Sequence, residues 1–126
     1  MKKGIFVVHI VDPDAAIADG LATLLSTYGI RVQSYPDAET FLASWSSASR
    51  RTGCLLIEAD LPGVSGPALL AQLNGAASSL PVLLMVSTSS PELIAAARES
   101  DRVCVIEKPC IDDALVTAIL AIRHQS

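Results

Sequence analysis

Aromatic side chains, clusters of basic residues and long hydrophobic runs are all scarce in this chain. Each shortage limits either the kind of core that the chain can form or the kind of function that it can have. Only 4% of the 126 residues are aromatic although 51% are hydrophobic, so the core must be built from aliphatic side chains. The net charge of −4 argues against direct nucleic-acid binding, because a phosphate-binding surface needs clustered basic residues. No apolar run approaches the roughly 20 residues that a membrane-spanning helix needs.

Cysteine is also rare, with three residues whose spacing matches no metal-binding pattern. An odd number of cysteines without a pairing pattern is typical of a reducing compartment. Cys54 and Cys104 lie inside apolar runs, so we expect both to be small core residues. The stretch after Lys2 and Lys3 is too short for a signal peptide, and we therefore expect a cytoplasmic protein.

The chain consists of apolar segments that alternate with amphipathic ones. The first apolar run is nearly continuous and rich in β-branched residues, which indicates a strand covered on both faces. The intervening segments carry apolar residues at helical spacing. This alternation predicts a single α/β domain over residues 1–126, with a parallel sheet between helical layers. The predicted strands cover residues 5–11, 30–35, 54–57, 81–86 and 103–106.

The first strand and the first helix carry two further expectations. His9 lies among apolar neighbours in the strand, and a lone histidine in such a place is more often a packed core residue than a ligand. The helix that follows has an apolar face that includes Leu21, Leu25 and Tyr28, and we expect it to end at Gly29.

Polar residues follow the ends of the predicted strands, where open parallel sheets bind their ligands. Asp12 also fits a helix cap, with Pro13 at the first helical position, so a cap and a pocket role both stay open for it. The polar residues are Asp12 and Asp14 after the first strand, Glu58 after the third, Ser87 and Thr88 after the fourth, and Lys108 after the fifth.

Four motifs at these strand ends occur together and in a fixed order. They read VHIVDPD (8–14), LPGVSG (61–66), LPVLLMVS (80–87) and IEKP (106–109). On these motifs the chain resembles the receiver domain of bacterial response regulators, in particular the branch that precedes LuxR-type helix-turn-helix output domains. The resemblance implies a flavodoxin-like (βα)5 fold with strand order 2-1-3-4-5. It also implies phosphorelay signalling, by a stand-alone domain or by part of a longer regulator with a DNA-binding output domain.

The family transfers a phosphoryl group from a partner histidine kinase to its own aspartate, with acidic groups holding Mg²⁺ and a lysine and a hydroxyl binding the phosphoryl oxygens. That aspartate stands four residues before the proline of the motif that here reads LPGVSG, and Glu58 occupies its position. Pro13 replaces the second metal-binding acid, so the resemblance implies weak or absent Mg²⁺ binding. Asp60 stays the alternative acceptor if the register shifts.

The other pocket positions are retained in part. Lys108-Pro109 matches the family, whereas Val105 replaces the switch aromatic residue. The hydroxyl position falls on Val86 or, after a one-residue shift, on Ser87. In this pocket we expect Glu58 to reach Lys108 and form an ion pair. The expected pocket residues are Asp12, Asp14, Glu58, Ser87, Lys108 and Pro109.

These departures favour an atypical, non-enzymatic receiver that works without phosphorylation and binds itself or a protein partner. A second hypothesis is a working phosphoacceptor that uses Glu58 or Asp60 with Mg²⁺. A third is a flavodoxin-like enzyme or cofactor binder, which the missing glycine-rich loop after the first strand disfavours. The resemblance places the protein contact on the fourth helix, fifth strand and fifth helix, at Leu93, Ile94, Ala97, Arg98, Val105, Asp112 and Asp113.

Overall fold

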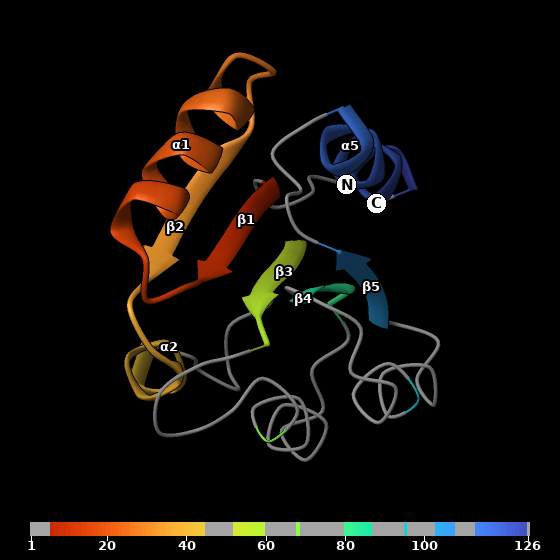
Figure 1. Cartoon of the computed structure of the whole chain (residues 1–126). Helices are drawn as coiled ribbons and strands as arrows, with labels where there is room; N and C mark the ends of the chain where they lie inside the picture. Colours follow the sequence, from red (N-terminus) through yellow and green to blue (C-terminus); the bar gives the residue numbers. More distant parts are fainter. Residues whose placement is uncertain are drawn as a thin grey trace.

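One parallel sheet forms the centre of the molecule. Its strands are β1 (Phe6–Val11), β2 (Arg31–Tyr35), β3 (Thr52–Glu58), β4 (Val82–Val86) and β5 (Val103–Glu107), in the order β2-β1-β3-β4-β5 (Figure 1). The computed structural model describes residues 6–44, 52–59, 68, 80–86, 95, 103–107 and 113–125. The predicted fold class and strand order are confirmed.

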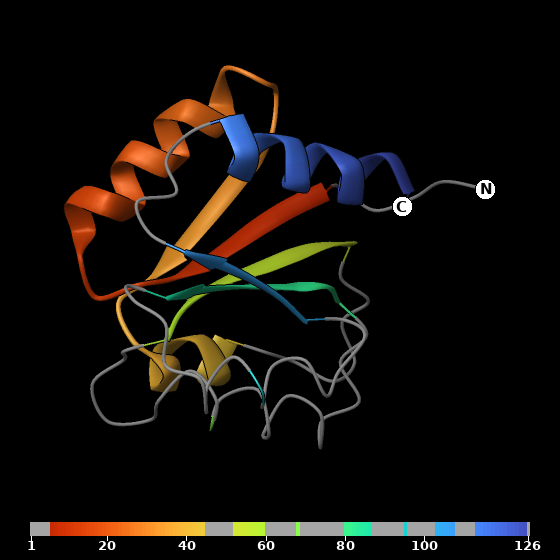
Figure 2. The same ribbon diagram turned by 45° about the vertical axis from the view of Figure 1, so that its right-hand side comes forward.

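Helices pack on both sides of this sheet. The helices α1 (Ala15–Ser26) and α5 (Asp113–Gln125) cover one side, and α2 (Ala38–Ser44) covers the other (Figure 2). No helix within the described ranges has the length and hydropathy needed to cross a membrane. The third and fourth helices predicted from the sequence lie largely outside the described residues.

The interior strands are buried on both sides, as their continuous apolar sequences predict. Every residue of 53–59 and of 82–86 is buried. Alternate residues of each strand face opposite helical layers, so the sheet separates two clusters. Val8, Ile10, Leu56 and Met85 belong to the cluster under α1 and α5, while Val11, Leu55, Ile57 and Leu84 belong to the cluster on the α2 side.

The start of α1 differs from the sequence prediction. Asp14, and not Asp12, is the N-cap: its Oδ1 accepts the amides of Ala16 at 3.0 Å and Ile17 at 3.3 Å. The helix begins at Ala15, so Pro13 precedes the cap and is not the first helical residue. The prediction failed because both aspartates satisfy the capping rule, and the sequence alone does not fix which one has extended backbone.

The end of α1 agrees with the prediction only in part. Gly29 has a positive φ of 74° and ends the turn after the helix, as expected of a glycine at this place. Tyr28, however, lies in that turn with 41% of its surface exposed, so the predicted place on the apolar face of the helix is wrong. Arg123 of α5 donates a hydrogen bond from Nη1 to the Tyr28 carbonyl oxygen at 3.3 Å.

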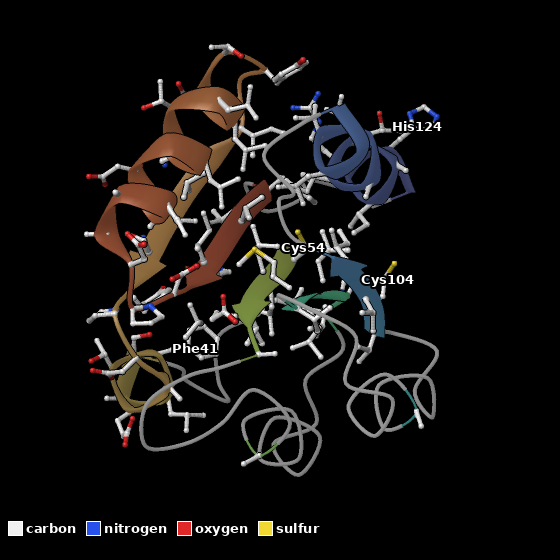
Figure 3. The ribbon with its side chains drawn as sticks, viewed as in Figure 1. Phe41, Cys54, Cys104 and His124 are labelled. Atoms are coloured by element: carbon white, nitrogen blue, oxygen red, sulfur yellow. The ribbon has the colours of Figure 1, made fainter. Side chains whose placement is uncertain are left out.

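The two described cysteines have different surroundings. Cys54 is fully buried in β3, and burial raises the pKa of its thiol to about 12, so it is an unreactive core residue. Cys104 is exposed on β5, which contradicts the prediction of a core residue (Figure 3). The reason is topological: β5 is an edge strand with a single neighbour, and an apolar run does not by itself reveal an edge.

Candidate functional site

Two acidic side chains are buried where the two central strands end. Val11 of β1 pairs with Ile57 of β3, and Asp12 and Glu58 are the residues that follow this pair. Each has only 4% of its surface exposed. These are the ends of adjacent strands at the point where the strand order reverses, which is where sheets of this topology bind ligands.

Asp12 is held in place by the backbone around it. Its amide donates to the Tyr35 carbonyl oxygen at 3.1 Å, which extends the pairing of β1 with β2 by one residue. Its Oδ1 accepts the amide of Asp14 at 2.8 Å. One oxygen of this carboxylate therefore shapes the loop that leads into α1.

Asp14 does not replace the missing acid at position 13. Its side chain is exposed and turns toward the start of α1, where its Oδ1 holds two backbone amides. A carboxylate in this role also offsets the partial positive charge at the helix N-terminus. The sequence prediction included Asp14 in the pocket, and the geometry gives it a capping role.

β4 ends on an apolar residue, and β5 carries one two residues before its end. Met85 of β4 pairs with Glu58, and Val86, with 1% of its surface exposed, packs into the cluster on the α2 side. Val105 of β5 is half-buried against the same cluster. Neither side chain carries a hydroxyl or an aromatic ring, so the described strands lack both groups that the family resemblance leads one to expect there.

The remaining predicted residues lie outside the part of the chain that the structure describes. They are the pocket residues Ser87, Lys108 and Pro109, the alternative acceptor Asp60, and Leu93, Ile94, Ala97, Arg98 and Asp112 of the predicted interaction face. Asp113 is the first residue of α5, at its N-terminal end. The Glu58–Lys108 pair therefore stays a prediction.

A buried polar cluster beside the site was missed by the sequence analysis. His9 has 3% of its surface exposed, and its Nδ1 lies 3.1 Å from the Tyr35 hydroxyl, which donates to Gln33 Oε1 at 3.0 Å. The prediction that His9 is a packed core residue is confirmed, but its partner is 26 residues away and needed the β1–β2 register to be found.

The family resemblance implies a three-acid arrangement for Mg²⁺. Among the residues that the structure describes, no group of three or more His, Cys, Asp or Glu side chains is placed to hold a metal. In the part of the chain that the structure describes, Asp12 and Glu58 are the buried carboxylates, and one oxygen of Asp12 accepts an amide.

The fold and the position of these acids together define a doubly wound α/β domain with its site at the carboxyl ends of β1 and β3. The sequence pattern of one family, the response regulator receiver domain, matches residues 8–120. The chain belongs to this family and is a receiver domain of two-component signalling, as the motifs predicted.

Similar proteins include several transcription regulators. FixJ, the transcriptional regulatory protein of Azorhizobium caulinodans, is 32% identical over 114 residues, which are 90% of this chain and 53% of that protein. The C4-dicarboxylate transport transcriptional regulatory protein DctR of Rhodobacter capsulatus is 30% identical over 118 residues, 92% of this chain and 59% of that protein. The chain thus spans little more than half the length of these relatives.

Solved structures agree with the fold. The crystal structure of FixJ-N superposes with a TM-score of 0.81 at 26% identity, over 98% of this chain and 96% of that chain. The chemotaxis response regulator CheY4 of Vibrio cholerae has a TM-score of 0.77 at 17% identity, over 94% of this chain and 99% of that one, and at this identity it supports the fold alone.

Proposed function

We propose that this chain is an atypical receiver domain that signals without phosphorylation and acts as a protein-interaction module in transcription control. The proposal rests on one observation: the two aspartates after β1 bind backbone amides at the start of α1. Asp12 accepts the amide of Asp14, Asp14 caps α1, and Pro13 stands where the family has its second acid. The acceptor position holds Glu58, which is buried at the end of β3.

These features support weak or absent Mg²⁺ binding. In the family a divalent cation neutralises the phosphoryl oxygens during transfer, and acidic side chains hold it. Here the loop after β1 has one carboxylate fewer in the pocket and uses part of the other for its own backbone. We therefore assign the chain no step that runs through Mg²⁺.

Glu58 is proposed to pair with Lys108 in place of a phosphoryl group. Two carboxylates buried at adjacent strand ends need a compensating positive charge, because an uncompensated buried charge is costly. Lys108 is the residue after Glu107, the last residue of β5. Glutamate has one methylene more than aspartate, so its carboxylate reaches further toward that end of the sheet.

The proposed contact with a second copy or another protein lies on the face of the predicted fourth helix, β5 and α5. Support comes from topology, because β5 is an edge strand that carries the exposed Cys104 (Figure 3). The relatives that match are transcription regulators, which supports a place in transcription control for a cytoplasmic protein. DNA binding would belong to an output domain and not to this acidic domain.

The decisive experiment is incubation with acetyl phosphate and Mg²⁺, followed by intact-mass analysis. We expect no gain of a phosphoryl group on the natural sequence. The matched control is the double variant Glu58→Asp with Pro13→Asp, which restores both acidic positions and is expected to gain one phosphoryl group. A stoichiometric gain on Glu58 or Asp60 of the natural chain would instead establish the second hypothesis, a working phosphoacceptor.

A second experiment tests the ion pair itself. Glu58→Gln keeps the shape of the side chain but removes its charge, so it should leave Lys108 without its partner and lower stability. Unchanged unfolding free energy, oligomeric state and partner binding in this variant would remove the support for the pair.

A further inference from the structure

A groove adjoins the candidate site and shares Asp12 with it. It lies between the loop after β1, the first turns of α1 and the end of β2, and its volume is about 200 Å³. Pockets for small molecules and cofactors usually measure about 300–1,000 Å³. The smaller volume of this groove suits one long side chain better than a cofactor.

The walls of the groove are short, rigid and largely apolar. Pro13, Ala15 and Ala18 form the wall on the α1 side, and residues 34–36 form the wall on the β2 side. Ala18 and Tyr35 are themselves buried, at 4% and 8% exposure, so the core fixes both walls. Proline and alanine lose almost no side-chain entropy when a ligand binds, so the groove is preformed.

The charge around the groove is negative. Asp12 and the exposed Asp19 line it, and no basic residue is among the described residues that line it. Asp37 follows Pro36 directly, and hydrogen bonds from the Thr40 hydroxyl and amide hold the pKa of this carboxyl below its ordinary value, so it is ionised at neutral pH. The half-charge at the N-terminus of α1 is offset by the full charge of its cap, Asp14.

We propose that this groove binds a basic side chain of a protein partner. Lysine and arginine combine an apolar stem with a charged head, so the stem would lie along the proline and alanine walls while the head reaches Asp19. The net charge of −4 favours such a partner over an acidic one. The proposal does not depend on whether Glu58 accepts a phosphoryl group.

The test is an amide NMR titration with two acetylated and amidated peptides, Ala-Arg-Ala-Arg-Ala and the same sequence with norleucine in place of arginine. The arginine peptide should give saturable shifts at Ala15, Ala18, Asp19 and Ser34, and the norleucine peptide should not. Asp19→Asn should weaken the arginine peptide about two- to fivefold, the loss expected for a solvent-exposed ion pair. The control Glu39→Gln, on the exposed surface of α2, should change the affinity less than twofold.

A second variant tests the groove and not the charge. Ala15→Leu adds three carbons at an exposed position at the start of α1, and it should abolish saturable binding while leaving the melting temperature within a few degrees. Retained affinity in this folded variant would overturn the proposal. So would equal weakening by Asp19→Asn and Glu39→Gln, which would show general attraction to an acidic surface. No phosphodonor is present, so these outcomes are independent of the acetyl phosphate experiment.

Discussion

The two sides of the sheet are packed by different chemistry. On the side of α1 and α5 the buried cluster consists of aliphatic residues with Cys54 and Met85. On the α2 side the aliphatic cluster continues into a histidine, a tyrosine and a phenylalanine in ring contact: Tyr35 and Phe41 lie 5.0 Å apart, and His9 stacks on Tyr35 at 6.0 Å. Phe41 points from α2 toward the sheet (Figure 3).

The difference shows which contacts specify the position of the site. Aliphatic packing is non-directional, so it stabilises the fold but tolerates exchanges of similar volume. The aromatic cluster is directional, because the Tyr35 hydroxyl joins β1 to β2 through His9 and Gln33. The same residue accepts the amide of Asp12 with its carbonyl oxygen. Tyr35 therefore links the α2 side of the core to the candidate site.

The largest expected effect is a cavity on the aliphatic side. Leu56 is fully buried in β3, and Leu56→Ala should lower the free energy of unfolding by about 2–5 kcal/mol, through lost burial and the cavity left behind. Urea denaturation measures this loss. Leu24→Ala, at a half-buried position on α1, is the control and should cost clearly less. Equal losses would mean that the centre of this side is loosely packed.

On the other side of the sheet, the hydroxyl of Tyr35 is the group to remove. Tyr35→Phe keeps the ring contacts but deletes the hydrogen bonds to His9 and Gln33, so it should cost about 1–2 kcal/mol. The matched control is Tyr28→Phe at the exposed tyrosine, which should change stability by less than about 0.5 kcal/mol. If both substitutions are neutral, the polar cluster does not contribute to the specificity that we assign to it.

Substitution of Asp14 tests whether its side chain caps α1 or binds a metal ion in the pocket. Asp14→Ala removes two hydrogen bonds to the start of α1 and should cost about 1 kcal/mol. The control Asp19→Ala, one turn further along the same helix, should stay within about 0.5 kcal/mol. A change in Mg²⁺ binding by NMR titration, without a loss of stability, would instead make Asp14 a metal ligand and reverse the geometric assignment.

The sequence predicted the architecture because apolar residues are spaced differently along the buried strands and along the amphipathic helices. It also placed Glu58 correctly at the end of β3, since the apolar run stops there. The cap of α1 could not be predicted, because the choice between two aspartates depends on one further backbone pairing, from the Asp12 amide to Tyr35. The exposure of Cys104 and the His9–Tyr35 contact depend on strand order and register, which no local pattern encodes.

The smallest expected effect concerns Asp37, which caps α2 on the aromatic side. The Thr40 hydroxyl and its amide, the latter at 2.7 Å, lower the pKa of this carboxyl. Because the pKa of Asp37 is lower in the folded than in the unfolded chain, its ionised carboxylate stabilises the fold at pH values above the unfolded pKa. This stabilisation is lost as the pH falls through the folded pKa. Asp37→Asn keeps a capping side chain without the charge, so its unfolding free energy should fall slightly less than that of the natural chain between about pH 5 and pH 2.

Urea midpoints at several pH values in that range measure this difference, with Glu39→Gln as the control in the first turn of the same helix. Because Asp37 is only partly buried, water and salt screen the interaction, and the expected difference is close to the resolution of the method. A large difference would imply that Asp37 also interacts with groups beyond Thr40. In that case acid would destabilise the α2 side through groups on its surface. The aromatic cluster beneath α2 would then not be the rigid support for Asp12 that its hydrogen bonds indicate.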